Sequence, residues 1–432
     1  MILAGGRGER LRPFTDDRPK AMVPIAGKPL LAYQIDSLRR CGLTDILLVT
    51  GYRGEQIASF FGDGSRLGVR LEYFVEREPL GTAGALVRLR ADLPEQILVL
   101  YGDLMLDADL SRFVAFHRGH SGSCSIVVHP NGHPADSDVV VLDARDMVRD
   151  ILRKNVPRSQ PYFNRVSAGL VLLDRTALTN LPEDRPLDLE SDVLVPAMVA
   201  GSLYGYRTPE YIKDMGTHDR LAQVERDVVN GLVERRNLAH PQRAVFLDRD
   251  GTINDHVGFL VRPEQLRVRD EVYEALELLN RSDYLAIVVS NQPVIARNLC
   301  SIEQLNAIHC RLESMLGERH VYLDDLFYCP HHEHAGFPGE NKAYKIVCEC
   351  RKPKTGMVRD AARRYGIDLS ASYLIGDTTV DVQTGKNSGV RTILLSTGEG
   401  GRDGKYPARP DAQADDLLQA VTQVLAAAGM RQ

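Results

Sequence analysis

The chain has 432 residues, of which 44% are hydrophobic and 26% are charged, and its formal net charge is −5. These values are ordinary for a folded protein and exclude a long disordered chain, a collagen-like chain and a coiled coil. The length exceeds one hydrophobic core and predicts two domains of about 200 residues each, while the negative charge argues against a general electrostatic grip on nucleic acid or an anionic membrane.

Neither a membrane span nor a secretion signal is expected. No uninterrupted apolar run approaches the length of a bilayer span. The first ten residues, MILAGGRGER, lack a basic region followed by an apolar one. Seven cysteines in a chain of this length are not a disulfide framework, and their odd number is typical of a reducing compartment. We therefore expect a cytoplasmic protein.

Short β-branched runs alternate with longer amphipathic stretches along both halves of the chain. The runs predict strands at 45–50, 96–103, 243–250, 284–292 and 372–377. The stretches predict helices at 28–41, 82–91, 269–281, 301–316 and 354–365. Such alternation is typical of parallel sheets covered by helices on both faces. We expect an α/β fold with two domains, each a mostly parallel sheet flanked by helices.

The domain boundary is expected near residue 240. A helical stretch over 217–236 ends in polar sequence, and a new apolar strand pattern begins at Ala244. Pro241 and the surrounding charges disfavour a continuing core element. The sequence therefore predicts a first domain over 1–230, a linker over 231–242 and a second domain over 243–432.

Residues 3–20, LAGGRGERLRPFTDDRPK, form a glycine-rich loop after a short apolar strand. Glycines let the backbone approach a ligand closely and supply amides that can point at phosphate oxygens. Arg10 and Lys20 would add positive charge. No Gly-Lys-Ser/Thr closes the loop, and Leu11 stands where a dinucleotide fingerprint has its third glycine. The loop by itself is equally consistent with a tight turn that carries solvated arginines.

The longer string, continued through KAMVPIAGKPLLAYQID, resembles the signature of the sugar-1-phosphate nucleotidyltransferases. The family pattern G-x-G-x-R, P-x-T, P-K and G-K-P is matched by residues 6–10, 13–15, 19–20 and 27–29. The resemblance covers roughly residues 1–225 and implies a Rossmann-like fold. It implies a nucleotide site formed by Leu3, Ala4, Gly5, Gly6, Gly8, Arg10, Gly81 and Thr82, within which 78–86 line the base pocket.

Further residues take their roles from the same resemblance. Asp103 in LYGD and Asp214 in KDMGT stand where the family has magnesium ligands, and Lys154 stands where it has a sugar-phosphate lysine. The neighbours of Lys154 depart from the usual Glu-Lys-Pro. In the implied reaction, a sugar 1-phosphate attacks the α-phosphate of a nucleoside triphosphate and pyrophosphate leaves. Because this chemistry depends on positioning and electrostatic compensation, Arg10 and Lys20 are the expected catalytic residues.

The second half begins with AVFLDRDGTIN, which places Asp248 and Asp250 where a buried strand ends. Residues two apart on an extended chain face the same side, so these carboxylates would repel each other unless a cation lay between them. That pattern suggests magnesium, a carboxylate nucleophile and a carboxylate that carries a proton. An Asp pair at a strand end is also common in turns without catalytic function.

The DRDGT string resembles the haloacid dehalogenase phosphatase superfamily, with its Rossmannoid fold. By this resemblance Asp248 forms an aspartyl-phosphate, Asp250 is the general acid and then the base, and Asp377 in LIGD completes a magnesium site with both. The phosphate and substrate groups that the resemblance implies are Ser290, Asn291 and Lys352.

CPHHEH at 329–334 and CEC at 348–350 form a cysteine and histidine cluster. The expected ligands of one structural zinc ion are Cys329, His331, Cys348 and Cys350, a sufficient set for a closed tetrahedral site. His332 and His334 are rival ligands, and free thiols beside a surface histidine cluster are the alternative to a metal site.

Residues 244–398 resemble the heptose 1,7-bisphosphate phosphatases and the related histidinol phosphatases, in which a zinc loop, here 329–350, shapes the substrate entrance. Arg297 and Arg351 would then bind the distal phosphate or sugar. The first half resembles the heptose 1-phosphate guanylyltransferases in KPLLAYQIDSLRRCG and REPLGTAGAL. Pro293, Val294 and Thr378 depart from the residues usual in that phosphatase family, and these departures bear on the choice of substrate.

Together the resemblances imply a bifunctional enzyme of nucleotide-activated heptose synthesis for a surface glycan. It would hydrolyse the 7-phosphate of D-glycero-D-manno-heptose 1,7-bisphosphate and transfer a nucleotidyl group, GMP from GTP, to heptose 1-phosphate, with Mg²⁺ in both domains and Zn²⁺ in the second. Two alternatives stay open: a hexose 1-phosphate nucleotidyltransferase joined to a histidinol-phosphate-type phosphatase, or a half that only binds or regulates. The expected partners are the sugar phosphate and nucleoside triphosphate substrates, without nucleic acid or membrane; a homo-oligomer is left open.

Overall fold

A computed structural model describes residues 1–336 and 338–429 of the chain. Residue 337 of the expected zinc loop and residues 430–432 of the expected second domain lie outside the described residues. The chain divides into two compact units. The first unit comprises Met1–His129, Val140–Leu152 and Val166–Ala239, and the second comprises Pro130–Val139, Arg153–Arg165 and the chain from His240 onward. Two short segments of the N-terminal half therefore belong to the second unit.

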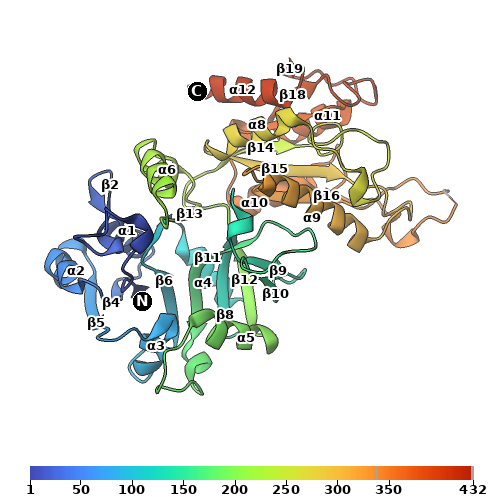
Figure 1. Cartoon of the computed structure of the whole chain (residues 1–432). Helices are drawn as coiled ribbons and strands as arrows, with labels where there is room; N and C mark the ends of the chain where they lie inside the picture. The colour runs from blue at the N-terminus through green and yellow to red at the C-terminus, as the bar shows by residue number, and fades with distance from the viewer. Residues whose placement is uncertain (337, 430–432) are drawn as a thin grey trace. The chain divides into compact units, whose positions relative to one another are not determined.

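The first unit is built on a mixed sheet (Figure 1). Strands β1 (Ile2–Leu3), β4 (Asp45–Thr50), β5 (Arg70–Val75) and β6 (Gln96–Tyr101) are parallel to one another. Strand β11 (Val166–Asp174) is antiparallel to β6 and to β8 (Cys124–His129). The other sheet strands are β9 (Val139–Leu142), β10 (Val148–Leu152) and β12 (Leu203–Arg207). The sheet therefore has a parallel part, formed by β6, β1, β4 and β5, which β11 extends on the β6 side as an antiparallel strand.

Hydrophobic clusters cover both faces of this sheet. One cluster contains buried side chains of α1 (Leu30–Arg40), α2 (Gly54–Phe61) and α4 (Leu110–Arg118). The other contains buried side chains of α3 (Gly81–Arg88), of the π-helix η6 (Leu189–Leu194) and of α5 (Val195–Val199). Successive residues of β6 enter different clusters: Leu100 lies in the first and Val99 in the second. The reason is that successive side chains of a strand point to opposite faces of the sheet.

A smaller antiparallel pair lies beside the main sheet of the first unit. Strand β7 (Leu104–Asp107) pairs with β13 (Tyr211–Asp214), so that Leu104 is opposite Asp214. Helix α6 (His218–Val229) follows β13, and Gly231, with a φ of +69°, separates it from α7 (Leu232–Arg235). Leu232 and Val233 are buried in a hydrophobic cluster of the first unit. The first residues of the expected linker are therefore packed rather than free.

The second unit has a fully parallel sheet in the order β16-β15-β14-β17-β18-β19 (Figure 1). These strands are β14 (Arg243–Leu247), β15 (Tyr284–Asn291), β16 (Asp325–Cys329), β17 (Tyr373–Gly376), β18 (Arg391–Leu395) and β19 (Ala412–Ala414). Helices α8 (Asp270–Asn280), α9 (Ile302–Glu318) and α12 (Leu417–Ala427) bury their apolar residues in one cluster with this sheet. Helices α10 (Gly356–Tyr365) and α11 (Thr379–Ser388) also pack against its strands.

The expected α/β fold is confirmed: each unit has a sheet with parallel strands at its centre and helices against it. The central strands β14 and β15 are almost entirely buried, which is why they consist of continuous apolar residues. In such sheets, ligands bind beyond the carboxyl ends of the strands. Among the described residues no helix combines the length and apolar character needed to cross a bilayer.

Candidate active sites and a candidate metal centre

The glycine-rich loop of the first unit leaves β1 and turns sharply at Gly8. Gly8 has a φ of +68°, and a Cβ there would lie 3.0 Å from Lys20 Cβ and 3.0 Å from Thr15 Cγ2. Glycine is needed at this close approach, because L side chains rarely adopt this backbone conformation. A Cβ on Gly6, in contrast, would meet nothing within 4 Å. The backbone at Gly6 therefore borders open space that a ligand could enter.

Lys20 and Asp103 form an ion pair beside this loop. Lys20 Nζ donates to Asp103 Oδ2 over 2.6 Å, and the lysine side chain is only 12% exposed. Met215 N donates to the main-chain oxygen of Asp103 over 3.0 Å, and Asp214 is opposite Leu104 in the β7–β13 pair. The structure thus brings Asp103, in the turn before β7, next to the end of β13, where Asp214 lies.

Asp214 is held by an arginine that the sequence analysis did not single out. Arg220 Nη1 donates to both carboxylate oxygens of Asp214, at 2.9 and 2.8 Å. A Cβ on Gly216 would lie 2.8 Å from Asp214 Oδ1 and 3.0 Å from Arg10 Nη2, so Arg10 also reaches this place. Three cations and two carboxylates leave a positive excess, which suits an anionic substrate.

The Gly81–Thr82 step is fixed by the turn at 187–189. Gly81 has a φ of +77°, and a Cβ there would lie 2.2 Å from the main-chain oxygen of Leu187. Thr82 Oγ1 donates to Asp188 Oδ2 over 2.9 Å and accepts from Leu189 N over 2.6 Å. The hydroxyl of Thr82 is therefore used within the protein, and the start of α3 is held rigidly.

Glu76 lies against the same loop and was missed from the sequence. A Cβ on Gly5 would lie 3.1 Å from Glu76 Oε2. Its other oxygen, Oε1, is buried and has no hydrogen-bond partner among the described residues. Burial raises the pKa of the Glu76 carboxyl above its usual value. Only the position of Glu76 just after β5 could have indicated it.

Lys154 belongs to the segment Arg153–Arg165, which groups with the second unit. Its side chain is exposed, and its main-chain N donates to Asp138 Oδ1 over 2.8 Å. The structure therefore does not bring Lys154 together with the glycine-rich loop in one unit. Its role in sugar-phosphate binding stays a prediction.

In the second unit, three carboxylates converge beyond the ends of β14 and β17. One oxygen from each of Asp248, Asp377 and Asp381 lies within 4.8 Å of the others, and all three residues are buried. Lys352 Nζ donates to Asp248 Oδ1 at 2.7 Å and to Asp381 Oδ1 at 2.5 Å. Asp248 directly follows β14 and Asp377 directly follows β17, so adjacent parallel strands deliver both to one edge.

Asp381 is the member of this group that the sequence analysis did not name. It lies in the first turn of α11, where Asp381 Oδ2 accepts from Thr378 N at 3.1 Å in a capping box. Its spacing of four residues from Asp377, across a strand-to-helix turn, was the available signal. A helix N-terminus also favours a carboxylate electrostatically.

The acidic group has the chemistry of a magnesium site. Asp377 Oδ1 is buried and has no hydrogen-bond partner among the described residues, so a cation would satisfy it. Burial raises the pKa of Asp248 to about 7, a shift that Lys352 opposes and that Asp381 and Asp377 increase. Burial also raises the pKa of Asp377 to about 7. Carboxylate oxygens are the ligands that Mg²⁺ prefers, and these residues fit the ion.

Asp250 does not join this acidic group. Its carboxylate accepts from Arg249 Nη2 at 2.9 and 2.8 Å, from Gln292 Nε2 at 2.8 Å and from Asn254 Nδ2 at 3.0 Å. Although burial raises the pKa of Asp250, the Arg249 charge and these donors lower it below its usual value. The structure therefore places Asp381, rather than the side chain of Asp250, with Asp248 and Asp377.

Ser290 and Asn291 lie at the end of β15, next to β14. Ser290 Oγ is buried and accepts from Gln292 Nε2 over 2.8 Å. The Asn291 side chain accepts from Lys352 N at 2.9 Å and donates to Lys352 O at 3.1 Å. Asn291 thereby fixes the backbone that carries Lys352, and its amide is already used in that contact.

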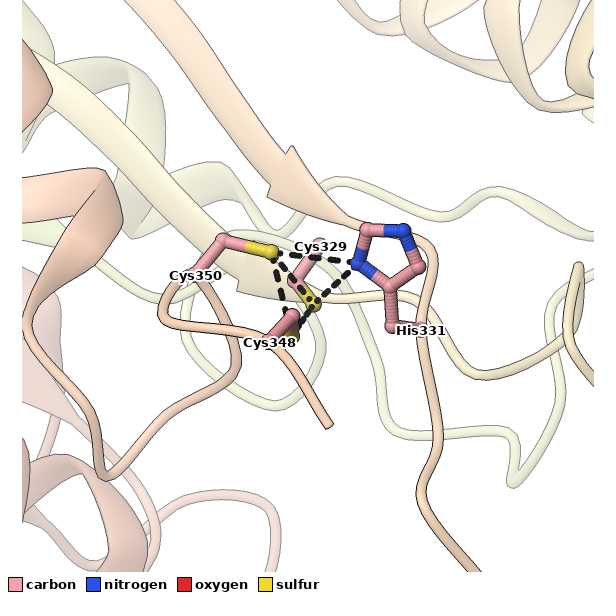
Figure 2. A group of neighbouring side chains, drawn as sticks. All are labelled: Cys329, His331, Cys348 and Cys350. Atoms are coloured by element: carbon pink, nitrogen blue, oxygen red, sulfur yellow. Dashed lines mark hydrogen bonds between the residues drawn. The ribbon is translucent and has the colours of Figure 1, made fainter. Parts of the chain in front are cut away.

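The predicted cysteine and histidine set comes together at one place (Figure 2). Cys329 is the last residue of β16, and the S–S distances are 3.6 Å from Cys329 to Cys348 and 3.3 Å from Cys348 to Cys350. His331 Nδ1 lies 3.3 Å from Cys350 Sγ. The sulfurs of Cys329 and Cys350 lie 3.0 Å apart. Zinc–sulfur bonds of about 2.3 Å give a tetrahedral edge of about 3.8 Å, so a small separation of the sulfurs would let all four donor atoms hold one ion.

The environment of the cluster also suits a thiolate metal site. Contacts with Cys329, and then with His331 and Cys348, lower the pKa of the Cys350 thiol to about 5. The same contact with Cys350 raises the pKa of Cys329, so Cys350 is the thiol of this pair that ionises first. The rival residues His332 and His334 are not members of this group of donor atoms, and His332 Nδ1 instead contacts the main-chain oxygen of His334 at 3.3 Å. Cys300 and Cys310 are unpaired thiols elsewhere, the first buried and the second partly buried.

The two arginines expected at the substrate entrance have different surroundings. Arg351 Nη1 donates to the main-chain oxygen of the zinc-set residue His331 over 3.1 Å. The Arg297 guanidinium lies 4.8 Å from the ring centroid of Phe259, a cation–π contact. Burial lowers the pKa of Arg351, although an arginine stays charged.

Comparison with known proteins agrees with both halves of this description. The nucleotidyl transferase family model matches residues 1–231, and a HAD-hydrolase-like model matches residues 349–420. The chain belongs to the nucleotidyl transferase family. Its second half belongs with the HAD-like phosphatases, because it is 40% identical over 157 residues to a D-glycero-beta-D-manno-heptose-1,7-bisphosphate 7-phosphatase of Photorhabdus laumondii, covering 36% of this chain and 81% of that protein.

The nucleotidyl transferase half is also similar to proteins of known name. It is 32% identical over 236 residues to a mannose-1-phosphate guanylyltransferase of Mycobacterium tuberculosis. The match covers 54% of this chain and 65% of that relative, so less than two thirds of the relative's length is matched.

Among solved structures, a D,D-heptose 1,7-bisphosphate phosphatase from B. bronchiseptica is 30% identical to this chain, with a TM-score of 0.38. The match covers 43% of this chain and 99% of that one.

Proposed function

We propose that this chain is a bifunctional enzyme that hydrolyses one phosphate of a sugar bisphosphate and transfers a nucleotidyl group to the resulting sugar 1-phosphate. The observation that carries the proposal is that each unit brings basic side chains and carboxylates together at its own candidate site. Lys20 and Arg10 lie beside the glycine-rich loop in the first unit, and Lys352 lies within the acidic group in the second. Both family memberships support the two reaction classes.

In the phosphatase half, an oxygen of Asp248 attacks the phosphorus and the bond from phosphorus to the sugar oxygen breaks. Lys352, which contacts both Asp248 and Asp381, compensates the charge on the phosphoryl group. Magnesium, held by Asp248, Asp377 and Asp381, would supply further positive charge at the phosphoryl oxygens. Ser290, near the end of the neighbouring strand β15, binds a phosphoryl oxygen through its hydroxyl.

Asp250 moves the protons in both halves of this reaction. It protonates the departing sugar oxygen; later it takes a proton from the water that attacks phosphorus and releases phosphate from Asp248. The hydrogen bonds from Arg249, Gln292 and Asn254 stabilise the ionised carboxylate, which is the form that the second step needs. The first step requires that Asp250 has first taken up a proton.

In the transferase half, the sugar phosphate attacks the α-phosphorus and pyrophosphate leaves. Lys20 and Arg10 neutralise the phosphoryl oxygens, and the amides of the glycine-rich loop hold the triphosphate. Asp103 and Asp214 would hold magnesium once the nucleotide draws Lys20 and Arg220 from them. This part of the proposal rests on the ion pairs that now occupy those carboxylates.

GTP is the proposed nucleotide. Guanine presents neighbouring N–H donors on its pairing edge, and a carboxylate can accept from both. Glu76 Oε1 is buried without a partner among the described residues, and Oε2 of the same carboxylate lies next to Gly5 of the loop. The guanylyltransferase relatives agree with this choice.

The proposed sugar is D-glycero-D-manno-heptose, because the phosphatase relative acts on its 1,7-bisphosphate. The two reactions are then successive steps toward a nucleotide-activated heptose for a surface glycan, carried out in the cytoplasm. Zinc held by Cys329, His331, Cys348 and Cys350 would shape the entrance of the phosphatase site, where Arg351 and Arg297 bind the part of the sugar phosphate that does not react.

The decisive experiment incubates the full chain with heptose 1,7-bisphosphate and each of the four nucleoside triphosphates in turn, followed by product mass. We expect a GDP-heptose from GTP and little product from the other three. The second candidate, a hexose 1-phosphate guanylyltransferase, is favoured by the mannose-1-phosphate guanylyltransferase relatives. A mannose 1-phosphate arm tests it: faster turnover of mannose 1-phosphate than of heptose 1-phosphate would replace the first proposal.

A further inference from the structure

A buried hydrogen-bond network lies behind the proposed proton carrier of the phosphatase site. Arg249 is fully buried, and its Nη2 donates to both oxygens of Asp250 and to Gln292 Oε1 at 3.1 Å. Its Nη1 lies 3.1 Å from His309 Nε2. His309 comes from the middle of α9, far from the DRD segment in the sequence, and only 1% of it is exposed.

The protonation of His309 follows from its partner. A guanidinium donates hydrogen bonds and accepts none, so His309 Nε2 is the acceptor and the ring proton is on Nδ1. Burial and the Arg249 charge lower the pKa of His309 well below its usual value, so the ring is neutral. His309 Nδ1 is itself buried without a partner among the described residues. An unpaired buried polar atom calls for an explanation, and the only polar contact of this ring that the structure records is to Arg249.

Gln292 connects this network to the phosphate site. Its Nε2 donates to Asp250 Oδ2 and to Ser290 Oγ, each over 2.8 Å. The orientation of Arg249 therefore bears on where the Asp250 carboxylate lies relative to Ser290. An arginine whose far end had no acceptor could tilt, and the carboxylate would move with it.

We propose that His309 is a positioning residue of the phosphatase reaction, which acts through Arg249 to hold the Asp250 carboxylate in place while water attacks the phosphoenzyme. The inference rests on the proposed roles of Asp248 and Asp250. In this step the bond from the water oxygen to phosphorus forms, the bond from Asp248 to phosphorus breaks, and a proton passes from water to Asp250. Misplacement of a reacting group by about 1 Å can cost about a hundredfold in rate.

The test compares His309→Leu, His309→Asn and His309→Gln in the full chain. Glutamine can place its Oε1 near the position of Nε2, whereas asparagine is too short and leucine has no acceptor. We expect His309→Leu and His309→Asn to lower kcat for phosphate release by about tenfold or more, with KM within about twofold of the original. Phosphoenzyme, seen as added mass on the intact chain, should accumulate in both. His309→Gln should stay within about threefold of the original kcat.

Nucleotidyl transfer and the melting temperature serve as controls for folding, and if the leucine chain does not fold, the glutamine and asparagine chains alone decide. An unchanged kcat in His309→Asn, equal losses in the asparagine and glutamine chains, or a loss without phosphoenzyme accumulation would each overturn the inference. Asp250→Asn separates it from the proposed function: full turnover in that variant refutes the role of Asp250, whereas an inactive Asp250→Asn beside an unaffected His309→Asn refutes only the role of His309.

Discussion

The ammonium of Lys352 donates to Asp248 over 2.7 Å, and the two side chains are only 3% and 11% exposed. Burial lowers the pKa of Lys352, but the charges of Asp248 and Asp381 raise it by more than burial lowers it, so the pKa lies above its usual value. The lysine is therefore a permanent cation at the proposed nucleophile. Asp248→Asn removes the carboxylate charge with little change of shape, and Lys352 keeps Asp381 as a partner, so the lysine is not left as an uncompensated buried charge.

Asp248→Asn should abolish phosphate release and leave nucleotidyl transfer within about twofold, because an amide does not attack phosphorus and the other reaction uses residues of the first unit. Phosphate release and pyrophosphate release from the same preparation measure both activities. Phosphate release near the original rate in Asp248→Asn would refute the assignment of the nucleophile.

Lys20→Met should reduce nucleotidyl transfer by about a hundredfold or more, since a charge aimed at a developing phosphoryl charge commonly contributes several kcal/mol. Methionine keeps most of the apolar stem that lies against Gly8. Arg12→Met is a matched control, because the Arg12 side chain is 68% exposed and pairs only locally with Asp16. A loss below about tenfold in Lys20→Met, or similar losses in both variants, would mean that Lys20 only supports the loop.

Magnesium should stabilise the second unit more at pH 8 than at pH 5.5. Burial raises the pKa of Asp248 and of Asp377 from the usual 3.8 to about 7. Without metal, their contribution to the free energy of unfolding is therefore fully present below pH 3.8 and is lost as pH rises through about 7. Because Mg²⁺ binds the ionised carboxylates, it should restore stability where that loss is complete.

At a concentration one hundred times its Kd, Mg²⁺ would add about 2.7 kcal/mol at pH 8, or several degrees of melting temperature. Asp377→Asn should remove the pH-dependent part of the shift. Equal magnesium shifts at both pH values, or an unchanged shift in Asp377→Asn, would contradict this site.

The chain purified without chelator should carry about one tightly bound zinc ion, and Cys350→Ser should release it. Structural zinc sites contribute folding free energy because their ligands are not assembled without the ion. Elemental analysis and phosphatase kinetics measure the effect, and binding of the bisphosphate should weaken because Arg351 contacts His331. Cys300→Ser, a thiol outside the set, is the control. Absence of zinc in the original chain would leave the cluster as ordinary thiols.

Gly81→Ala should destabilise the first unit by about 2 kcal/mol or more. Its φ of +77° and the 2.2 Å approach of a Cβ to Leu187 O both oppose a side chain. Gly6→Ala should leave the melting temperature unchanged, because its Cβ would meet nothing within 4 Å. Calorimetry separates the two. Because we place Gly6 at the nucleotide, Gly6→Ala should raise KM for the triphosphate while the melting temperature stays the same. An unaffected KM would place the nucleotide elsewhere.

Much of the fold and of both sites could be predicted from local sequence. Asp248 and Asp377 each follow a short apolar run, and runs of this length that alternate with helices are typical of buried strands whose carboxyl ends meet at one edge of a parallel sheet. The cysteine and histidine set could be named because its members fall into two short groups. In each case the chemistry-bearing residue stands next to the element that positions it.

Other features depended on segments that are distant in the sequence. Asp381 replaces the side chain of Asp250 in the acidic group, since Arg249, Gln292 and Asn254 hold Asp250 elsewhere. Lys154 lies in a segment that groups with the second unit.

The amino-acid sequence by itself determined the two α/β halves, their order and the residues at the strand ends, because apolar periodicity and strand-end position are local properties. Only the tertiary structure decided that Glu76 faces the glycine-rich loop and that His309 of α9 meets Arg249. Neither residue follows a recognisable pattern, and each acquires its partner only when separate elements pack. Buried polar groups must find partners among whatever the packing brings near them, and no local rule specifies which these are.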